Sequence, residues 1–280
     1  MTVRTTWRDT LAAVGRHGSL LAVGAVLMLP FYWMASSALK ATAQIFARPT
    51  QWWPDPPAWE NLVNILDYPG FPYWILLGNT LFYVAFVTVG TVISCAAAAY
   101  SFACLRWAGR DSLFALTLMT LLIPAIATFL PTYLIFARLG LTGSYLPLIL
   151  PAFLGNAFFI FMLRQFFLGI PRELFDAARM DGAGEIRIFL QIAMPIVRPA
   201  LIVVAVFTIL YTWHEFFGPL IYLQDPEDFP LSLGLYAFRT QRATEWGLSM
   251  TGALYMTLPL IVLFALGQRY FIRGVTASKL

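Results

Sequence analysis

Charged side chains gather in one short stretch of this chain, between Pro171 and Pro199. The stretch holds four arginines and four acidic residues, which are Arg172, Glu173, Asp176, Arg179, Asp181, Glu185, Arg187 and Arg198. Long apolar runs lie on both sides of it. Because charged side chains are costly inside a bilayer, this stretch is predicted to lie in water.

The local sequence predicts two short helices joined by a bend. Pro171 suits a first helical turn, and Glu173 then lies near the positive end of the helix dipole. Gly182 can adopt the left-handed conformation that ends a helix. A second helix over about 183–193 is expected to stop before Pro195, which has no amide hydrogen to donate. We call residues 169–198 the knob, and its compact shape predicts that it fits a groove on another protein.

No arrangement of residues in the sequence predicts catalysis. There is no GxxxxGK[ST] phosphate-binding loop, so the chain is not expected to bind ATP itself. No motif places a serine or cysteine nucleophile beside an activating histidine. The two cysteines, Cys95 and Cys104, fall in one apolar run and are interpreted as packing residues, and no metal site is expected. The basic positions are dispersed and do not form a nucleic-acid surface.

Composition assigns the chain to the integral membrane proteins. Of its 280 residues, 60% are hydrophobic and only 11% are charged, whereas soluble domains have about 25% charged residues. A span of the bilayer needs about twenty apolar residues. Six runs meet this need, at about 19–39, 73–105, 112–137, 144–163, 199–223 and 246–267. The expected fold is all-α, with six transmembrane helices.

The domain organisation follows from these runs. We expect an N-terminal segment over 1–18, a transmembrane domain over 19–272 that includes the knob, and a tail over 273–280. A cleavable signal peptide is the alternative for the first run, since small residues occur at 35–38. Pro124, Pro131 and Pro151 interrupt the third and fourth runs, which indicates a packed or water-lined interior there.

Basic residues predict the orientation in the membrane. On the side of the knob and both termini lie Arg4, Arg8, Arg16, Arg106, Arg110, Arg164, Arg172, Arg179, Arg187, Arg198, Arg269, Arg273 and Lys279. The opposite side has only Lys40, Arg48, Arg138, Arg239 and Arg242. Because positive residues collect on the cytoplasmic side, the knob and both termini are expected in the cytoplasm. The tryptophans of the loop over 40–72 are expected at the membrane interface or, alternatively, stacked on carbohydrate.

Glu215 is the one acidic residue inside a predicted span. A charge at that depth costs about 2.5–3.5 kcal/mol, so it needs a partner, another subunit or a watery cavity. Trp213, His214 and Glu215 are therefore candidates for a translocation path or a subunit interface, and a structural contact between helices is the alternative. Asn79, Tyr133 and Asn156 are further candidates for the path, with helix–helix hydrogen bonds as their alternative role.

The knob carries the strongest resemblance to a known family. Asp176-Ala177-Ala178, Asp181-Gly182-Ala183, Pro195 and Pro199 resemble the EAA loop of ABC-importer permeases, in the sugar-importing branch related to the maltose permease. Asp176 departs from the glutamate usual there. Further similar segments are 37–40, 78–80, 99–103, 123–124, 130–133, 163–167 and 212–216. In the last, His214 replaces the family's asparagine, and the tail after Gly274 lacks the usual Gly-Ala-Val-Lys.

The resemblance implies a transport subunit. In that family the EAA loop is a coupling helix that docks on a cytoplasmic ATPase, a role implied here for Asp176, Ala177, Ala178, Asp181, Gly182 and Ala183. It implies a second homologous permease, two ATPase subunits that use ATP and Mg, and an extracytoplasmic solute-binding protein that delivers a sugar. This chain would bind no cofactor and would lie in a bacterial or archaeal plasma membrane. A stand-alone ion-coupled carrier using Glu215 is the alternative.

Overall fold

The computed structural model describes residues 7–238 and 245–277, and its regular structure over these residues is helical. This confirms the all-α prediction. The chain divides into two compact units. The first comprises Met1–Phe71 and Ala237–Pro259, and the second, which we call the permease unit, comprises Pro72–Tyr236 and Leu260–Leu280. Arg4, Arg239, Arg242 and Lys279 lie outside the described residues, as do the side chains of Arg8, Arg269 and Arg273.

Helices of three kinds make up the chain. Those of ten residues or more are α1 (Trp7–Ala38), α4 (Tyr73–Cys104), α5 (Arg110–Met119), α6 (Ala125–Arg138), α8 (Ala157–Leu168), α12 (Arg198–His214) and α15 (Trp246–Ala277). The shorter α-helices are α2 (Thr42–Ile45), α3 (Glu60–Asn64), α7 (Leu146–Ile149), α9 (Arg172–Met180), α10 (Glu185–Ile188), α11 (Met194–Ile196), α13 (Phe217–Tyr222) and α14 (Leu231–Gly234). The 3₁₀ segments are η1 (Thr120–Leu122), η2 (Leu150–Leu154), η4 (Pro226–Asp228) and η5 (Leu235–Phe238), and η3 (Phe189–Ala193) is a π-helix.

Four stretches of the described chain are long and apolar enough to cross a membrane. They are Val14–Ala38, Tyr73–Cys104, Leu146–Leu168 and Trp246–Ala265. Two bent pairs, α5–η1 with α6 and α10–α11 with α12, raise the number to six if each pair is one crossing. The second span was predicted to end at Leu105, one residue beyond the observed end of α4.

The third predicted span is bent by 101° between η1 and α6. Pro124 is the residue before α6, and Ile123 is extended with φ −82° and ψ 118°. Because proline disfavours helix at the residue before it and donates no amide hydrogen, the helix cannot continue through this dipeptide. The run over 112–137 is therefore two helices and not one straight span.

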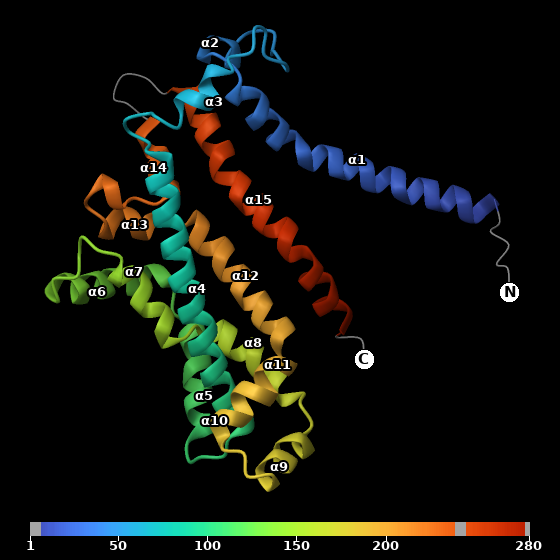
Figure 1. Ribbon diagram of the computed structural model, residues 1–280, viewed down its shortest axis with the longest axis vertical. Coiled ribbons are helices and arrows are strands. Elements are labelled where there is room, and N and C mark those ends of the chain that lie inside the picture. Colours follow the sequence, from blue (N-terminus) through green and yellow to red (C-terminus); the bar gives the residue numbers. More distant parts are fainter. Residues whose placement is uncertain (1–6, 239–244, 278–280) are drawn as a thin grey trace. The chain divides into compact units, whose positions relative to one another are not determined.

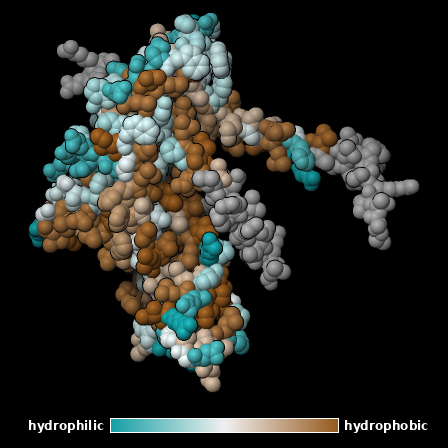
Figure 2. Space-filling model, in the orientation of Figure 1, coloured by the Kyte–Doolittle hydropathy of each residue, from teal (hydrophilic) through white to brown (hydrophobic). Residues whose placement is uncertain are grey.

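Three helices form the centre of the permease unit. α4 packs against both α8 and α12, and all three lie side by side in Figure 1. Their contact buries Cys95, Leu163 and Val204 completely. Close packing of η2 on α4 depends on Gly90, because an added Cβ there would lie 2.6 Å from the Phe153 ring. Hydrophobic residues dominate the surface along these helices, as Figure 2 shows, which fits a lipid-facing exterior.

In the first unit, Lys40 anchors the loop that follows α1. Its side chain is completely buried, and its Nζ donates a hydrogen bond to the Gln51 carbonyl at 2.6 Å. The ammonium also lies 4.3 Å from the centre of the Trp33 ring. Burial lowers the pKa of Lys40. Trp52 and Trp53 of the same loop are more than half exposed, as expected of residues at a membrane interface.

Candidate functional site: the knob

The first helix of the knob follows its sequence closely. Pro171 is the residue before α9, and Glu173 lies in its first turn. After α9 ends, Gly182 adopts a φ of +80°. The amide of Ala183 donates to the Ala178 carbonyl at 2.9 Å, which closes the turn. The left-handed corner predicted at Gly182 is confirmed, and it reverses the chain between α9 and α10.

The second helix of the knob does not end where the sequence predicted. It continues through Pro195 as α10, η3 and α11, and the chain bends only at Val197, by 79°, before α12 begins. The prediction of a stop before Pro195 is wrong. The π-helical turns of η3 precede the proline, and Pro195 then occupies the first turn of α11, where its missing amide hydrogen is tolerated.

The two faces of α9 differ in exposure. Phe175 and Ala178 are buried against the core that Tyr100 and Phe167 also line. Ala177, the neighbouring residue about 100° further round the helix, is exposed. The two alanines therefore have different surroundings. One provides a close contact with the permease unit, and the other leaves an accessible outer surface.

One of two ion pairs of Arg179 joins the two helices of the knob. Arg179 donates to Asp176 Oδ1 at 3.0 Å and to Glu185 Oε1 at 2.9 Å. The hydroxyl of Tyr100, near the end of α4, donates to Glu185 Oε2 at 3.0 Å. The Tyr100 ring also packs against Phe175 and Phe189. A single chain of contacts therefore joins α9, α10 and α4.

Sequence analysis missed Tyr100 and Glu185 as parts of this site. The two residues lie 85 positions apart, and no local pattern links them. One local feature could have pointed to the Arg179–Glu185 pair. Glu185 is an acidic residue in the first turn of the second helix, and an arginine lies six positions before it.

The Glu215 region is a helix break and not the interior of a span. α12 ends at His214, and Glu215 is extended with ψ 120°. Glu215 Oε1 accepts a hydrogen bond from the Gly218 amide at 3.0 Å, so the carboxylate caps α13. Its Oε2 is buried without a hydrogen-bond partner among the described residues. Trp213 is buried, whereas His214 is exposed.

The other path candidates also contact backbone. The Asn79 amide donates to the carbonyls of Glu227 and Phe229, at 2.6 and 3.1 Å. Asn156 Oδ1 accepts from the two amides that open α8, at 3.0 and 3.2 Å, and so acts as its N-cap. The Tyr133 ring lies 5.7 Å from the Tyr222 ring. Among the described residues, no hydrogen bond or ring contact joins Asn79, Tyr133 and Asn156 to one another.

The chain is similar to known membrane transport components. A family profile described as the binding-protein-dependent transport system inner membrane component matches residues 90–277, which include the whole knob. In a bacterial ABC transporter for alginate import, one chain of the crystal structure superposes with a TM-score of 0.79 at 22% identity, covering 96% of this chain and 100% of that one.

Two curated relatives are similar over most of their length. The arabinooligosaccharides transport system permease protein AraQ of Halalkalibacterium halodurans is 32% identical, over 78% of each chain. The sn-glycerol-3-phosphate transport system permease protein UgpE of Yersinia pestis is 30% identical, over 93% of this chain and 95% of its own. The chain therefore belongs to the family of inner-membrane permease components of binding-protein-dependent ABC importers.

Proposed function

We propose that this permease forms half of the translocation pore of an ATP-driven importer for sugars or related solutes. The support comes from its relatives, whose names specify arabinooligosaccharides and sn-glycerol 3-phosphate, and from the similar alginate importer. A stand-alone ion-coupled carrier is incompatible with a family whose transport depends on a binding protein.

The knob is the proposed contact with the ATPase. The knob exposes three large apolar side chains, Leu174, Met180 and Ile186, at 45%, 88% and 77%. Large apolar side chains exposed on a charged, water-facing segment indicate a protein-binding surface. This surface is the observation that carries the proposal. Asp176, Ala177, Ala178, Asp181, Gly182 and Ala183 are the residues to which we assign coupling.

The remaining partners and the orientation follow from the same assignment. We assign a second homologous permease, two cytoplasmic ATPase subunits and an extracytoplasmic solute-binding protein, in a bacterial or archaeal plasma membrane. The excess of arginines on the side of the knob supports cytoplasmic termini and a cytoplasmic knob. A complex between the similar alginate importer and its periplasmic protein loaded with an alginate pentasaccharide supports the binding-protein partner.

The contacts of the knob provide a route for movement into the membrane. Closure of the ATPase subunits on ATP would displace the knob. Glu185 would then pull on Tyr100 and hence on α4, while η3 and α11 lead directly into α12. Because α4 and α12 pack together, both would move as one body and change which side of the membrane the cavity faces.

The path itself is assigned to a second set of residues. Asn79, Tyr133, Asn156, Trp213, His214 and Glu215 remain our candidates for its lining. The unpartnered, buried Oε2 of Glu215 is the strongest argument among them, because a buried carboxylate oxygen needs a solute, water or another subunit.

A reconstituted complex tests this function. We expect that ATP hydrolysis by the complete transporter, in the presence of its binding protein, rises with one compound from a panel of arabinooligosaccharides, alginate oligosaccharides, maltose and sn-glycerol 3-phosphate. Hydrolysis that none of these compounds changes would contradict the sugar assignment. Loss of the response when the binding protein is omitted is the required control.

A further inference from the structure

A basic hollow lies where α4 meets the knob. It has a volume of about 710 Å³ and is lined by the end of α4, the loop after it, the end of α8 and the inner side of α9. A second hollow of about 470 Å³ adjoins it and shares Arg106, Trp107, Arg110 and Arg172. Both lie wholly within the permease unit.

The arginines of the hollow are unequally paired. Arg179 is neutralised by Asp176 and Glu185, and Arg110 is bonded to Asp111 at 2.9 Å. Arg106 and Arg172, in contrast, form no ion pair within 7–238 and 245–277. Both are exposed, so two positive charges are free to bind an anion from outside.

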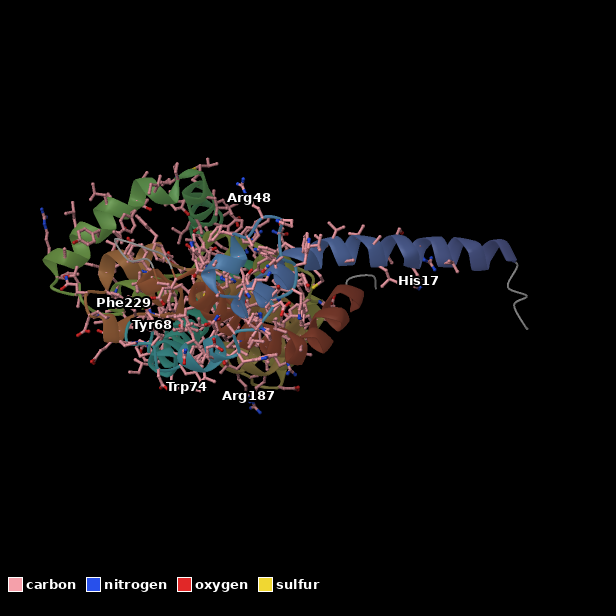
Figure 3. All side chains as sticks on the ribbon, turned by 90° about the horizontal axis from the view of Figure 1, so that it is seen from above. His17, Arg48, Tyr68, Trp74, Arg187 and Phe229 are labelled. Atoms are coloured by element: carbon pink, nitrogen blue, oxygen red, sulfur yellow. The ribbon has the colours of Figure 1, made fainter. Side chains whose placement is uncertain are left out.

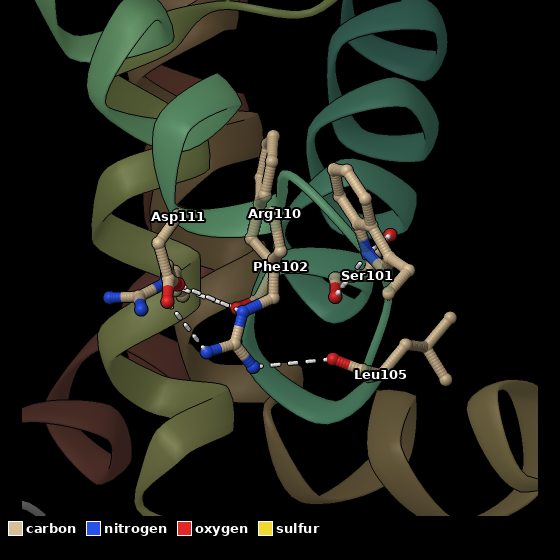
Figure 4. A network of polar contacts seen from close by, with 7 residues as sticks. Ser101, Phe102, Leu105, Arg110 and Asp111 are labelled. Atoms are coloured by element: carbon tan, nitrogen blue, oxygen red, sulfur yellow. Dashed lines mark hydrogen bonds and ion pairs between the residues drawn. The ribbon is translucent and has the colours of Figure 1, made fainter.

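Figure 4 shows polar contacts that hold the loop after α4 in place. Arg110 also donates to the Leu105 carbonyl at 3.3 Å, and the Trp107 indole donates to the Ser101 hydroxyl at 3.1 Å. These bonds fix the loop against α4 and α5. The loop that carries Arg106 is therefore held in place by hydrogen bonds within the chain.

The hollow lies at the level of a membrane surface. The apolar span of α4 ends at Cys104, and Arg106 and Trp107 follow within three residues. Tryptophan favours this interfacial depth. Apolar Leu105 and Leu168 form part of the wall beside the arginines, and Leu168 is 46% exposed. A ligand with both an anionic group and an apolar part matches these two kinds of lining.

We infer that this hollow binds the head group of an anionic phospholipid. Arg106 and Arg172 bind the phosphate, Trp107 lies beside the glycerol region, and Leu105 and Leu168 contact the start of the acyl chains. Basic pockets at the ends of transmembrane helices bind lipid head groups in this way. The inference requires only that α4 spans the membrane, and it does not depend on the proposed substrate or on coupling.

The lining argues against a protein segment as the occupant. The apolar residues that we assign to the ATPase contact, Leu174, Met180 and Ile186, are all outside the lining of the hollow. Of the residues to which we assign coupling, only Asp176 also lines the hollow. The apolar residues of the ATPase contact and the hollow therefore do not overlap, so a lipid and a protein partner can be bound together.

Native mass spectrometry of the intact complex tests the site. The complex is released from nanodiscs made of equal parts phosphatidylcholine and phosphatidylglycerol, and retained lipids are counted. We expect wild type to retain a phosphatidylglycerol that the double variant Arg106→Gln/Arg172→Gln loses. Each arginine near a membrane surface contributes about fivefold to binding, so the double variant should bind about 25-fold more weakly.

Two control variants test whether the loss of lipid is specific to the charges in the hollow. Arg187→Gln removes an arginine from the same knob, but Arg187 bonds to Gln191, lies outside the hollow and points outward in Figure 3, so retention should be unchanged. Arg106→Lys keeps the charge and should keep the lipid. Equal retention by wild type and the double variant would overturn the inference. Displacement of the lipid by inorganic phosphate would also overturn the inference. So would a lipid that is retained by the permease pair alone but is absent from the assembled complex.

Discussion

The knob and the helix break at Glu215 differ in how their charged groups are satisfied. Both regions place charged residues next to apolar segments at the ends of helices. In the knob, Arg179 lies between two carboxylates, and the hydroxyl of Tyr100 satisfies a further oxygen. At the break, one oxygen of Glu215 caps α13 and the other is buried without a partner among the described residues.

The chain itself satisfies the charges around Arg179, whereas it leaves one buried oxygen of Glu215 without a partner among the described residues. Asp176, Arg179 and Glu185 of the knob are paired within the chain, so this part of the knob is preformed before a partner binds. The carboxylate at the break retains an unused acceptor, whose burial is costly unless something outside the chain satisfies it. Substitutions at Gly182, Tyr100 and Glu215 test this contrast.

Gly182→Val should have the largest effect on the knob. The left-handed conformation costs an L-residue about 1–2 kcal/mol, and more with a β-branched side chain, so coupled uptake should fall by about tenfold or more. Solute uptake into proteoliposomes measures this. Gly184→Val is the matched control, because Gly184 is extended with φ −72° and an added Cβ has open space at both glycines. Retained uptake in Gly182→Val would refute the role of the corner.

Tyr100→Phe should uncouple the knob from α4 more mildly. The lost hydrogen bond to a half-exposed carboxylate contributes about 1 kcal/mol, so ATP consumed per solute imported should rise by about fivefold. Because Glu185 also pairs with Arg179, Glu185→Gln should have an effect of its own, but the double variant with Tyr100→Phe should change by less than the sum of the two single effects. Tyr145→Phe is the control, since it also removes a tyrosine hydroxyl that donates a hydrogen bond, here to the Asp228 backbone carbonyl outside the knob. Additive effects of the two knob variants would exclude a shared route.

Glu215→Gln should give the smallest change of the three variants, and it tests the role of the helix break. Glutamine keeps an oxygen for the Gly218 amide, so the abundance of the protein in the membrane should remain normal. Uptake should fall because the charge on the buried oxygen is lost. Glu215→Ala, which also removes the cap, should lower abundance. Normal uptake together with lost expression in Glu215→Gln would favour a purely structural role.

Much of the fold was predictable because it depends on local sequence. Uncharged runs placed the start of α4 at Tyr73 and its end within one residue, since a bilayer sets the length of a span. Gly182 was predictable because few other residues accept a positive φ. Pro124 predicted an interruption, but its angle depends on how the helices on either side pack.

Local residue types and hydropathy were sufficient to predict the class of the protein, its helical runs, the knob and the corner at Gly182. The packing of the helices determines which alanine faces inward, that the helix passes Pro195, and that Tyr100 meets Glu185. It also showed that Glu215 caps a helix after a break. Hydropathy and backbone preference act over a few residues and can be read from the chain. Pairing of side chains across 85 positions depends on how helices pack, which no local pattern specifies.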